Sequence, residues 1–572
     1  MLTQSLPALD SRHHQAFPVL LESEVYRVRE FGSVREFKDG DTLQKIGDIG
    51  RGLAIVLSGK IEVVQYDIAS RPKSVAAYGP GAFMGELAQL AGRPALVDAF
   101  ARGAVEALLI EPERLRALII AEAELGERIM RALILRRVGL IESGAGGPVI
   151  LGTADNGDVL RLANFLRRNG HPLQILDPDH DPDAKALVER FRLDSGRLPI
   201  VVCPQGELLY NPGEYELARC IGLVAPIDPT RSYDVAVVGA GPAGLAAAVY
   251  AASEGLSTLV LDCRARGGQA GTSARIENYL GFPTGISGAA LMARAYNQAH
   301  KFGVEIAIPA EVANLETPDD PAIDLFLLRL ANGEVVRTRT VVIASGARYR
   351  RLAVEKLEEF ESSSVHYWAS PLEGKLCEGQ EVILVGAGNS AGQATVYLAS
   401  RAAKVRLIAR GSDLSGNMSR YLVDRIQGLS NVEVLTETEI VRLDGKDGKL
   451  RSVTWRHGPS GKETQRAARH LFLFIGADPN TDWLGGSAVA IDAKGFVVTG
   501  PAVDRARQLE TSCEGIFAIG DVRAGSVKRV AAAVGDGAGV VAEVHGYLAA
   551  KDRDAADSLA PTESRRLIAV AR

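Results

Sequence analysis

Two segments of the chain carry residues suited to binding the phosphates of dinucleotides. The first runs Tyr233-Asp-Val-Ala-Val-Val-Gly-Ala-Gly-Pro-Ala-Gly244 and the second runs Glu381-Val-Ile-Leu-Val-Gly-Ala-Gly-Asn-Ser-Ala391. In each, an apolar strand leads into a glycine turn that opens a helix, whose N-terminus offers amide donors and a positive dipole end. One such motif alone is weak evidence. Two in this context predict a flavin and a nicotinamide bound by one polypeptide.

The first motif has the features of a flavin site. Its glycines allow a tight turn, close approach of a pyrophosphate and close helix–strand packing. The next strand, residues 257–262, ends in Asp262, where a carboxylate can accept hydrogen bonds from ribose hydroxyls. The predicted contacts in this motif are Gly239, Gly241, Pro242, Ala243, Gly244 and Asp262.

The second motif favours NADPH over NADH. At the place equivalent to Asp262 the chain has Ala409, followed by Arg410, and an arginine can pair with a 2′-phosphate that a carboxylate would repel. The alternative is that Arg410 is only a solvated cation at a strand end. The predicted NADPH contacts are Gly386, Gly388, Asn389, Ser390, Ala391 and Arg410.

Several further motifs, in this order along the chain, resemble those of low-molecular-weight thioredoxin reductases. They are Arg266-Gly-Gly-Gln269, Ile276-Glu-Asn-Tyr-Leu-Gly-Phe282, Val342-Ile-Ala-Ser-Gly346, Phe474-Ile-Gly-Ala-Asp-Pro-Asn480 and Phe517-Ala-Ile-Gly-Asp-Val522. The resemblance covers roughly residues 230–548. It implies a homodimer in which NADPH delivers hydride to FAD. It also implies further FAD contacts at Gly268, Gln269, Asn278, Gly346, Gly520, Asp521, Val530 and Ala531.

The redox-active Cys-x-x-Cys of that family is missing. Trp368 and Pro371 stand in the corresponding region, and neither can carry electrons as a thiol pair does. Cys377 nearby is isolated, and His366 is more consistent with a structural role. We therefore expect an external electron acceptor and negligible thioredoxin reduction. The alternatives are an activity like that of ferredoxin– or flavodoxin–NADP reductases, or a non-catalytic sensor that uses its bound flavin.

The segment Pro80–Ala95 resembles the phosphate cassette of cyclic-nucleotide-binding domains, together with an expected β-roll before it and one long helix over 112–141. The resemblance assigns Gly85 and Glu86 to a ribose hydroxyl. The arginine that pairs with the cyclic phosphate is replaced by Ala95, and Arg93 would have to reach round to replace it. We expect a scaffold with weak or no affinity for cyclic nucleotides, and a nucleotide ligand is the alternative.

Residues 146–226 resemble a thioredoxin fold with a cis-proline at Pro199. The place of the active-site cysteines holds Thr153-Ala-Asp-Asn-Gly157, and Cys203 is interpreted as a core residue in a strand. We therefore expect a docking role without redox chemistry.

The bulk composition fits a cytoplasmic multidomain protein. The chain has 572 residues, a net charge of −5 and five scattered cysteines, with no membrane-spanning run, nucleic-acid signature or expected metal site. The expected organisation has a β-roll with a C-terminal helix (1–145), the thioredoxin-like part (146–226) and two Rossmann-like three-layer domains. These are an FAD domain (230–346 and 472–550) and an NADPH domain (347–471), followed by a loose tail (551–572).

Overall fold

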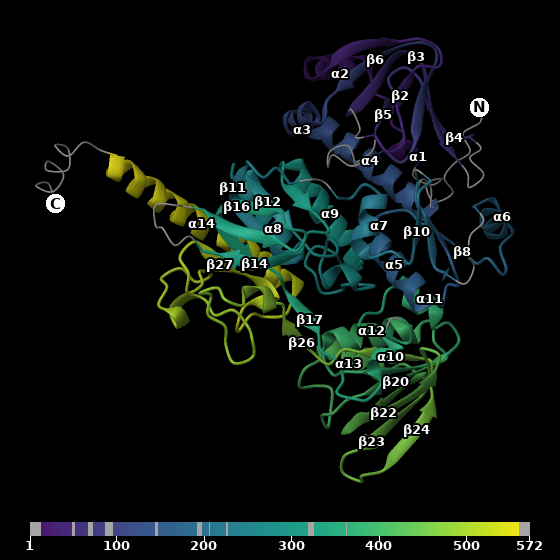
Figure 1. Cartoon of the computed structure of the whole chain (residues 1–572), viewed down its shortest axis with the longest axis vertical. Coiled ribbons are helices and arrows are strands. Elements are labelled where there is room, and N and C mark those ends of the chain that lie inside the picture. The colour runs from purple at the N-terminus through teal and green to yellow at the C-terminus, as the bar shows by residue number, and fades with distance from the viewer. Residues whose placement is uncertain are drawn as a thin grey trace, which may run out of the picture.

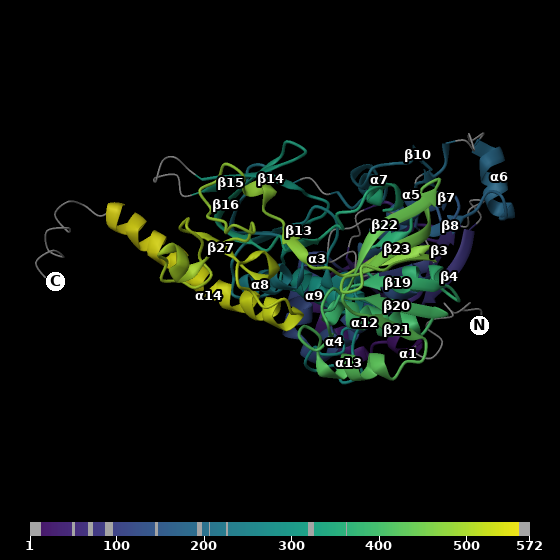
Figure 2. The same ribbon diagram turned by 90° about the horizontal axis from the view of Figure 1, so that it is seen from below.

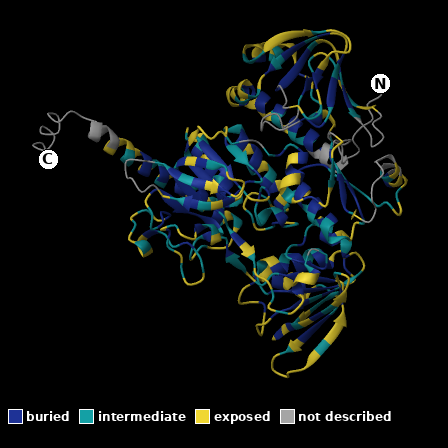
Figure 3. Cartoon of the chain, viewed as in Figure 1, coloured by how far each residue is buried: buried dark blue, intermediate teal, exposed yellow. Residues whose placement is uncertain are grey.

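The computed structural model describes residues 13–48, 52–66, 72–85, 95–143, 147–191, 197–204, 206–224, 227–317, 325–361 and 363–559. Figure 1 shows a β-roll at one end, an α/β layer structure in the centre and a second α/β unit at the other end. Each of these parts has its own buried core (Figure 3). Within the described residues, no helix combines the length and apolarity needed to cross a bilayer.

The N-terminal part is an antiparallel β-roll in the order β1-β6-β3-β4, with β2 paired to β6 and β5 to β3. A single long helix was expected after the roll, but the structure has two, because the backbone leaves the helical region at Glu122. The elements are α1 (His13–Ala16), α2 (Glu22–Val28), β1 (Ser33–Phe37), β2 (Thr42–Gln44), β3 (Leu53–Tyr66), β4 (Pro72–Tyr78), β5 (Phe83–Met84), β6 (Asp98–Ile110), α3 (Pro112–Ala121) and α4 (Ala123–Ser143).

The next part has the strand and helix order of a thioredoxin fold. Its sheet has the order β10-β9-β7-β8, with β7 and β8 parallel and the other pairs antiparallel. The predicted cis peptide is present between Leu198 and Pro199. The elements are β7 (Val149–Leu151), α5 (Gly157–Arg168), β8 (Gln174–Leu176), α6 (Pro182–Phe191), β9 (Ile200–Val202), β10 (Leu208–Tyr210) and α7 (Glu214–Cys220).

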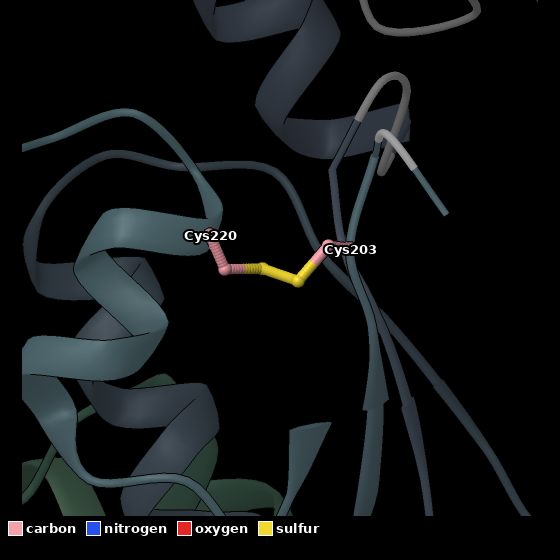
Figure 4. Close-up of a disulfide and its surroundings, with 2 residues drawn as sticks. All are labelled: Cys203 and Cys220. Atoms are coloured by element: carbon pink, nitrogen blue, oxygen red, sulfur yellow. A yellow bond between two sulfur atoms is a disulfide. The ribbon is translucent and has the colours of Figure 1, made fainter. Parts of the chain in front are cut away.

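A disulfide between Cys203 and Cys220 corrects the interpretation of Cys203 as an isolated core thiol within a strand (Figure 4). Cys203 follows the end of β9, and Cys220 is the last residue of α7. Both lie in the apolar core of the thioredoxin-like part, 3% and 5% exposed. The expectation of a cytoplasmic protein rested in part on five scattered cysteines, and two of the five are paired in the structure.

The FAD part is a seven-stranded sheet in the order β13-β12-β11-β16-β15-β14, with β27 paired to β16. Strands β13, β12, β11, β16 and β27 are parallel, so their carboxyl ends meet at one edge. Its elements are β11 (Ser232–Val238), α8 (Pro242–Ser253), β12 (Thr258–Leu261), α9 (Gly288–Lys301), β13 (Glu305–Ala307), β14 (Val312–Glu316), β15 (Phe326–Leu330), β16 (Val335–Ile343), β27 (Ile516–Ala518) and α14 (Val530–Leu559).

Helix α14 packs against α8 and then projects from the body in both views (Figures 1 and 2). A loose tail was expected from residue 551, but the helix continues to Leu559. The expected tail therefore begins no earlier than residue 560, outside the described residues.

The NADPH part contains a parallel sheet in the order β18-β25-β19-β20-β21 and a three-stranded antiparallel sheet. A small antiparallel pair, β17 with β26, lies where the chain passes between the two cofactor-binding parts. The elements are β17 (Ala347–Tyr349), α10 (Leu357–Phe360), β18 (Val365–His366), α11 (Pro371–Leu376), β19 (Glu381–Val385), α12 (Asn389–Ala399), β20 (Lys404–Ile408), α13 (Arg420–Gln427), β21 (Val432–Leu435), β22 (Thr438–Lys446), β23 (Lys449–His457), β24 (Glu463–Ala467), β25 (His470–Leu473) and β26 (Ala477–Pro479).

Candidate functional site

The first glycine turn lies at the carboxyl end of β11, next to the N-terminus of α8. Gly239 has φ of +117°, and a Cβ there would lie 2.2 Å from the carbonyl oxygen of Ala344, so only glycine fits. Gly241 is the N-cap of α8 and brings no side chain to its free amides. The helix therefore presents unpaired N–H groups at the turn, as a pyrophosphate requires.

Residues distant in sequence complete this cradle. A Cβ at Gly268 would lie 3.1 Å from Cα of Gly241, and a Cβ at Gly520 would lie 2.9 Å from Cβ of Ala243. The structure thus gathers the first turn, the 266–269 motif and the 517–522 motif around one space. The small residues at these positions allow the close backbone approach that FAD needs, so the residues present fit the cofactor.

Asp262 is fixed at the end of β12 by backbone donors. One carboxylate oxygen accepts a hydrogen bond from the amide of Ala240 at 2.8 Å, and the other accepts from the amides of Arg264 and Ala265 at 3.0 Å each. Asp262 is thereby tied to the first turn. A carboxylate has about four lone-pair sites, which leaves capacity for a ribose hydroxyl.

The other predicted FAD contacts lie in different environments. The side-chain amide of Gln269 donates to the carbonyl of Ala347. Burial, together with the nearby Asp536, raises the pKa of Asp521. Val530 is the first residue of α14, with Ala531 next to it. Asn278 is exposed.

Arg168, which sequence reasoning missed, reaches the flavin motifs from the thioredoxin-like part. This last residue of α5 donates a hydrogen bond to the carbonyl of Gly268 at 3.2 Å, while Asn169 donates to the carbonyl of Arg264 at 3.1 Å. Burial lowers the Arg168 pKa, and its Nε has no partner among the described residues. The sequence held no signal for this contact, because it depends on the packing of two separate units.

Tyr349, at the end of β17, also belongs to this region. Burial raises its pKa, and its hydroxyl is hydrogen-bonded to Thr272. Arg168 and Asp521 are the charged groups that act on it. Tyr349 therefore lies near enough to both Arg168 and the 517–522 motif to feel their charges.

The second glycine turn repeats the geometry of the first between β19 and α12. A Cβ at Gly386 would lie 2.6 Å from the carbonyl oxygen of Phe474, whereas a Cβ at Gly388 would have no neighbouring atom within 4 Å. The N-terminus of α12 therefore faces open space, which fits a bound pyrophosphate. Asn389 instead accepts a hydrogen bond from the amide of Ser419 at 2.7 Å, so its side chain supports the loop before α13.

Ser390 is exposed beside the second turn and Ala391 is buried behind it. Arg410 is exposed two residues after the end of β20. Among the described residues it has neither a hydrogen bond nor an ion pair, so its guanidinium is available to a ligand.

The place of the family's dithiol holds a hydrogen-bonded helix start. Ser370 caps α11, Pro371 is its first residue, and Glu373 accepts from the Ser370 amide at 2.9 Å. The Trp368 indole N–H donates to the same carboxylate at 3.1 Å. Cys377 is buried, which raises its thiol pKa to about 12. No thiol pair therefore lies at this position.

The end of α5 also lies near this helix start. Partial desolvation lowers the pKa of Arg167, and the nearby Glu373 carboxylate raises it. Arg167 and Arg168 thus place one helix terminus of the thioredoxin-like part close to both α11 and the flavin motifs. Figure 1 shows the same arrangement, with α5 and α7 between the roll and the NADPH part.

In the β-roll, the predicted nucleotide contacts Glu86 and Arg93 lie outside the described residues. Gly85 is described, and its carbonyl accepts a hydrogen bond from Arg136 of α4 at 3.3 Å. Ala95, at the place of the usual phosphate-binding arginine, is buried.

Comparison with known proteins agrees with this geometry. Residues 233–537, more than half of the chain, match the model of the pyridine nucleotide-disulphide oxidoreductase family. The chain belongs to this family. Residues 34–122 match the model of the cyclic nucleotide-binding domain. The two matches confirm the predicted cyclic-nucleotide-binding-like roll and the predicted fold of the cofactor-binding parts, and family membership confirms that the protein is an oxidoreductase that uses FAD and NADPH.

Similar members of the family cover the cofactor-binding parts. Thioredoxin reductase of Bacillus subtilis is 31% identical over 318 residues, which are 56% of this chain and 95% of that protein. NADPH-dependent thioredoxin reductase 3 of Arabidopsis thaliana is 33% identical over 55% of this chain and 58% of its own length. The solved structure of Lactococcus lactis thioredoxin reductase matches 55% of this chain and 99% of its own, with 28% identity and a TM-score of 0.51.

Proposed function

We propose that this protein oxidises NADPH at one site and passes the electrons, through FAD, to an acceptor outside the chain. The observation that carries the proposal is the helix start at residues 368–373, where a tryptophan, a serine cap and a buried glutamate replace a thiol pair. When bound, the two cofactors supply the hydride transfer and the redox chemistry. The chain's own residues hold the two dinucleotides and orient them.

The remaining cysteines do not offer a second route. The described free thiols, Cys263, Cys377 and Cys513, form no disulfide and lie in three different segments, after β12, after α11 and before β27. The disulfide between Cys203 and Cys220 lies inside the core of the thioredoxin-like part, where a reduced flavin ring has no access to its sulfur atoms. An external acceptor is therefore the outcome that these residues support.

The position of α5 adds a steric argument. Relatives named thioredoxin reductase pass their electrons to a thioredoxin. Here the protein's own thioredoxin-like part covers the flavin motifs through Arg168 and lies near α11 through Arg167. We propose that it occupies space that a separate thioredoxin would need, and that the functional unit is a homodimer, as the resemblance implies.

The test is an anaerobic titration of the FAD-loaded protein with NADPH, followed by an acceptor series. We expect NADPH to bleach the flavin absorbance, and added quinone, oxygen or a ferredoxin-type protein to restore it, while oxidised thioredoxin does not. A flavin that stays oxidised under NADPH would contradict the NADPH-oxidising half of the proposal. Rapid reduction of thioredoxin would contradict the acceptor half.

A matched variant tests the internal disulfide. The double substitution Cys203→Ser with Cys220→Ser should leave both NADPH bleaching and acceptor reduction intact. If the variant still bleaches with NADPH but no longer reduces any acceptor, the electrons pass through this disulfide and the external route from the flavin is wrong.

A further inference from the structure

The β-roll contains a cavity that opens between its strands and the C-terminal helix α4. The void amounts to about 540 Å³, counting the part open to solvent. Most of its wall is apolar. The side chains of Val63, Val75, Met84 and Val97 form one portion of the wall. The rings of Phe17 and Tyr78 form another.

The cavity wall includes the buried guanidinium of Arg136. Three aromatic rings surround it, with its central carbon 5.1 Å from the ring centres of Phe17 and Tyr78 and 4.7 Å from that of Phe83. Its Nε donates to the carbonyl of Ala16 at 2.7 Å, and Nη1 donates to those of Phe83 and Gly85 at 2.9 and 3.3 Å.

This cation has no anionic counterpart among the described residues. Its Nη2 has no hydrogen-bond partner there, and its interactions are with rings and carbonyls alone. Burial lowers its pKa, and the one titratable group that acts against this effect is the Tyr78 phenol. A buried charge is costly unless it is paired, and no described residue supplies the counter-ion, so an anion from outside would stabilise the site.

The chemistry of the wall selects among anions. In the cyclic-nucleotide-binding domains that the roll resembles, an arginine at the position of Ala95 pairs with the phosphate, and here that position holds a buried methyl group. The valines and Met84 cannot solvate a ribose or a strongly hydrated phosphate, but they can cover an aliphatic chain or an aromatic ring. The Nη2 of Arg136, which has no partner among the described residues, can donate a charge-assisted hydrogen bond to a carboxylate oxygen.

We propose that the β-roll cavity binds a small organic carboxylate, with its apolar body against the aliphatic wall and its carboxylate paired with Arg136. The ligand would carry one negative charge and a body of a few carbon atoms, such as a benzoate or a medium-chain fatty acid. This site is separate from both dinucleotide sites and does not depend on the proposed electron acceptor.

Calorimetric titration of the full-length, FAD-loaded protein tests the ligand class. We expect saturable binding of octanoate or benzoate, at least ~10-fold tighter than octanamide or benzamide, because the amides lack the charge that pairs with Arg136. Cyclic AMP should bind more weakly than either carboxylate. Equal affinity for acid and amide, tighter binding of cyclic AMP, or no saturable binding of either acid would each overturn the proposal.

Two variants locate the site. Arg136→Gln should abolish the preference for acid over amide, whereas the matched control Arg102→Gln, an exposed arginine on β6 of the same roll, should retain it. If Arg136→Gln does not fold, Ala76→Leu replaces it, because a larger side chain at this wall position should exclude octanoate while keeping the charge. Unchanged octanoate binding in a folded form of either variant would place the ligand elsewhere and contradict the assignment.

Discussion

At the scale of single residues, we predict that the preference for NADPH over NADH depends on Arg410. It is exposed, without a partner among the described residues, and follows the strand whose end faces the ribose in this type of site. Arg410→Ser should raise the KM for NADPH by about 10-fold or more, because a charge-assisted hydrogen bond contributes roughly 1.5–3 kcal/mol. The KM for NADH should stay the same.

Steady-state NADPH and NADH oxidation with one fixed acceptor measures this effect. Arg420→Ser, at an exposed arginine of α13 paired with Asp424, is the matched control. Equal loss of affinity for both nucleotides would show that Arg410 supports the fold of the site and does not read the 2′-phosphate.

The buried pair His366 and His470 makes stability depend on pH. The two rings are linked by a 3.0 Å nitrogen–nitrogen contact. Burial lowers the pKa of His366 to about 4, and burial with the neighbouring His366 lowers that of His470 to about 3. Both rings are therefore neutral in the folded protein at pH values where the unfolded chain, with a His pKa near 6.5, already binds protons.

The stability that these rings contribute is present above about pH 6.5 and is lost as the pH falls toward 4. We expect the free energy of unfolding to fall steadily from pH 7 to pH 5, by on the order of a few kcal/mol. The unfolding midpoint should fall with it. The double substitution His366→Gln with His470→Gln should flatten this slope. His457→Gln, at a histidine whose ring contacts Ser460, should leave it unchanged. A slope equal in all three proteins would assign the pH dependence to other groups.

At the scale of elements, the helix start that replaces the dithiol should be a structural feature. Ser370→Ala removes the side chain that caps α11 and should cost about 1 kcal/mol of stability. Because the cap does not contact either glycine turn, NADPH should bleach the flavin as fast as in the unmodified protein. Thermal unfolding and stopped-flow absorbance measure the two effects, and a large loss of bleaching rate would give the cap a part in electron transfer.

The elements that the sequence predicted correctly are those defined by local patterns. Each glycine turn combines a strand, small residues and a helix start within a dozen positions, so its local structure can be predicted from that short segment alone. The cis peptide before Pro199 was predicted from the resemblance to a thioredoxin fold, in which a cis-proline often stands at this strand. The interruption of the helix at Glu122 was not predicted, because the residues on both sides of it have helical spacing. The continuation of α14 beyond residue 550 was not predicted either, because a charged, Ala-rich segment can form a helix or a loose tail.

Contacts between separate parts of the chain were not predictable from a single sequence. Nothing in the spacing of Cys203 and Cys220 shows that the end of β9 meets the end of α7. Arg168 lies in an ordinary helical segment, and only packing brings it to Gly268. The burial of Arg136 among three rings and backbone carbonyls likewise depends on the closed roll.

At the scale of the whole molecule, the docked thioredoxin-like part should help to retain FAD. Arg168→Met removes the hydrogen bond to Gly268 and should weaken FAD binding by about 10-fold, the effect of losing roughly 1.5 kcal/mol. The apparent affinity follows from flavin release during dilution, measured by fluorescence. Arg161→Met, on the same helix but bonded within its own part, is the control and should retain FAD. Equal release from both variants would mean that the helix as a whole, and not Arg168, supports the cofactor.

Helix α4 joins two sites that otherwise have nothing in common. Arg136 lines the cavity of the roll, and the next residue, Arg137, donates a 2.9 Å hydrogen bond to the carbonyl of Gly170, two positions beyond Arg168. A carboxylate that shifts this helix would therefore alter the surface that Arg168 presents to the flavin motifs. Thermodynamic reciprocity then requires that, if octanoate changes the affinity for FAD by some factor, FAD changes the affinity for octanoate by the same factor. In that case carboxylate binding to the roll would change the affinity of the protein for FAD, and removal of FAD would change the affinity of the roll for the carboxylate.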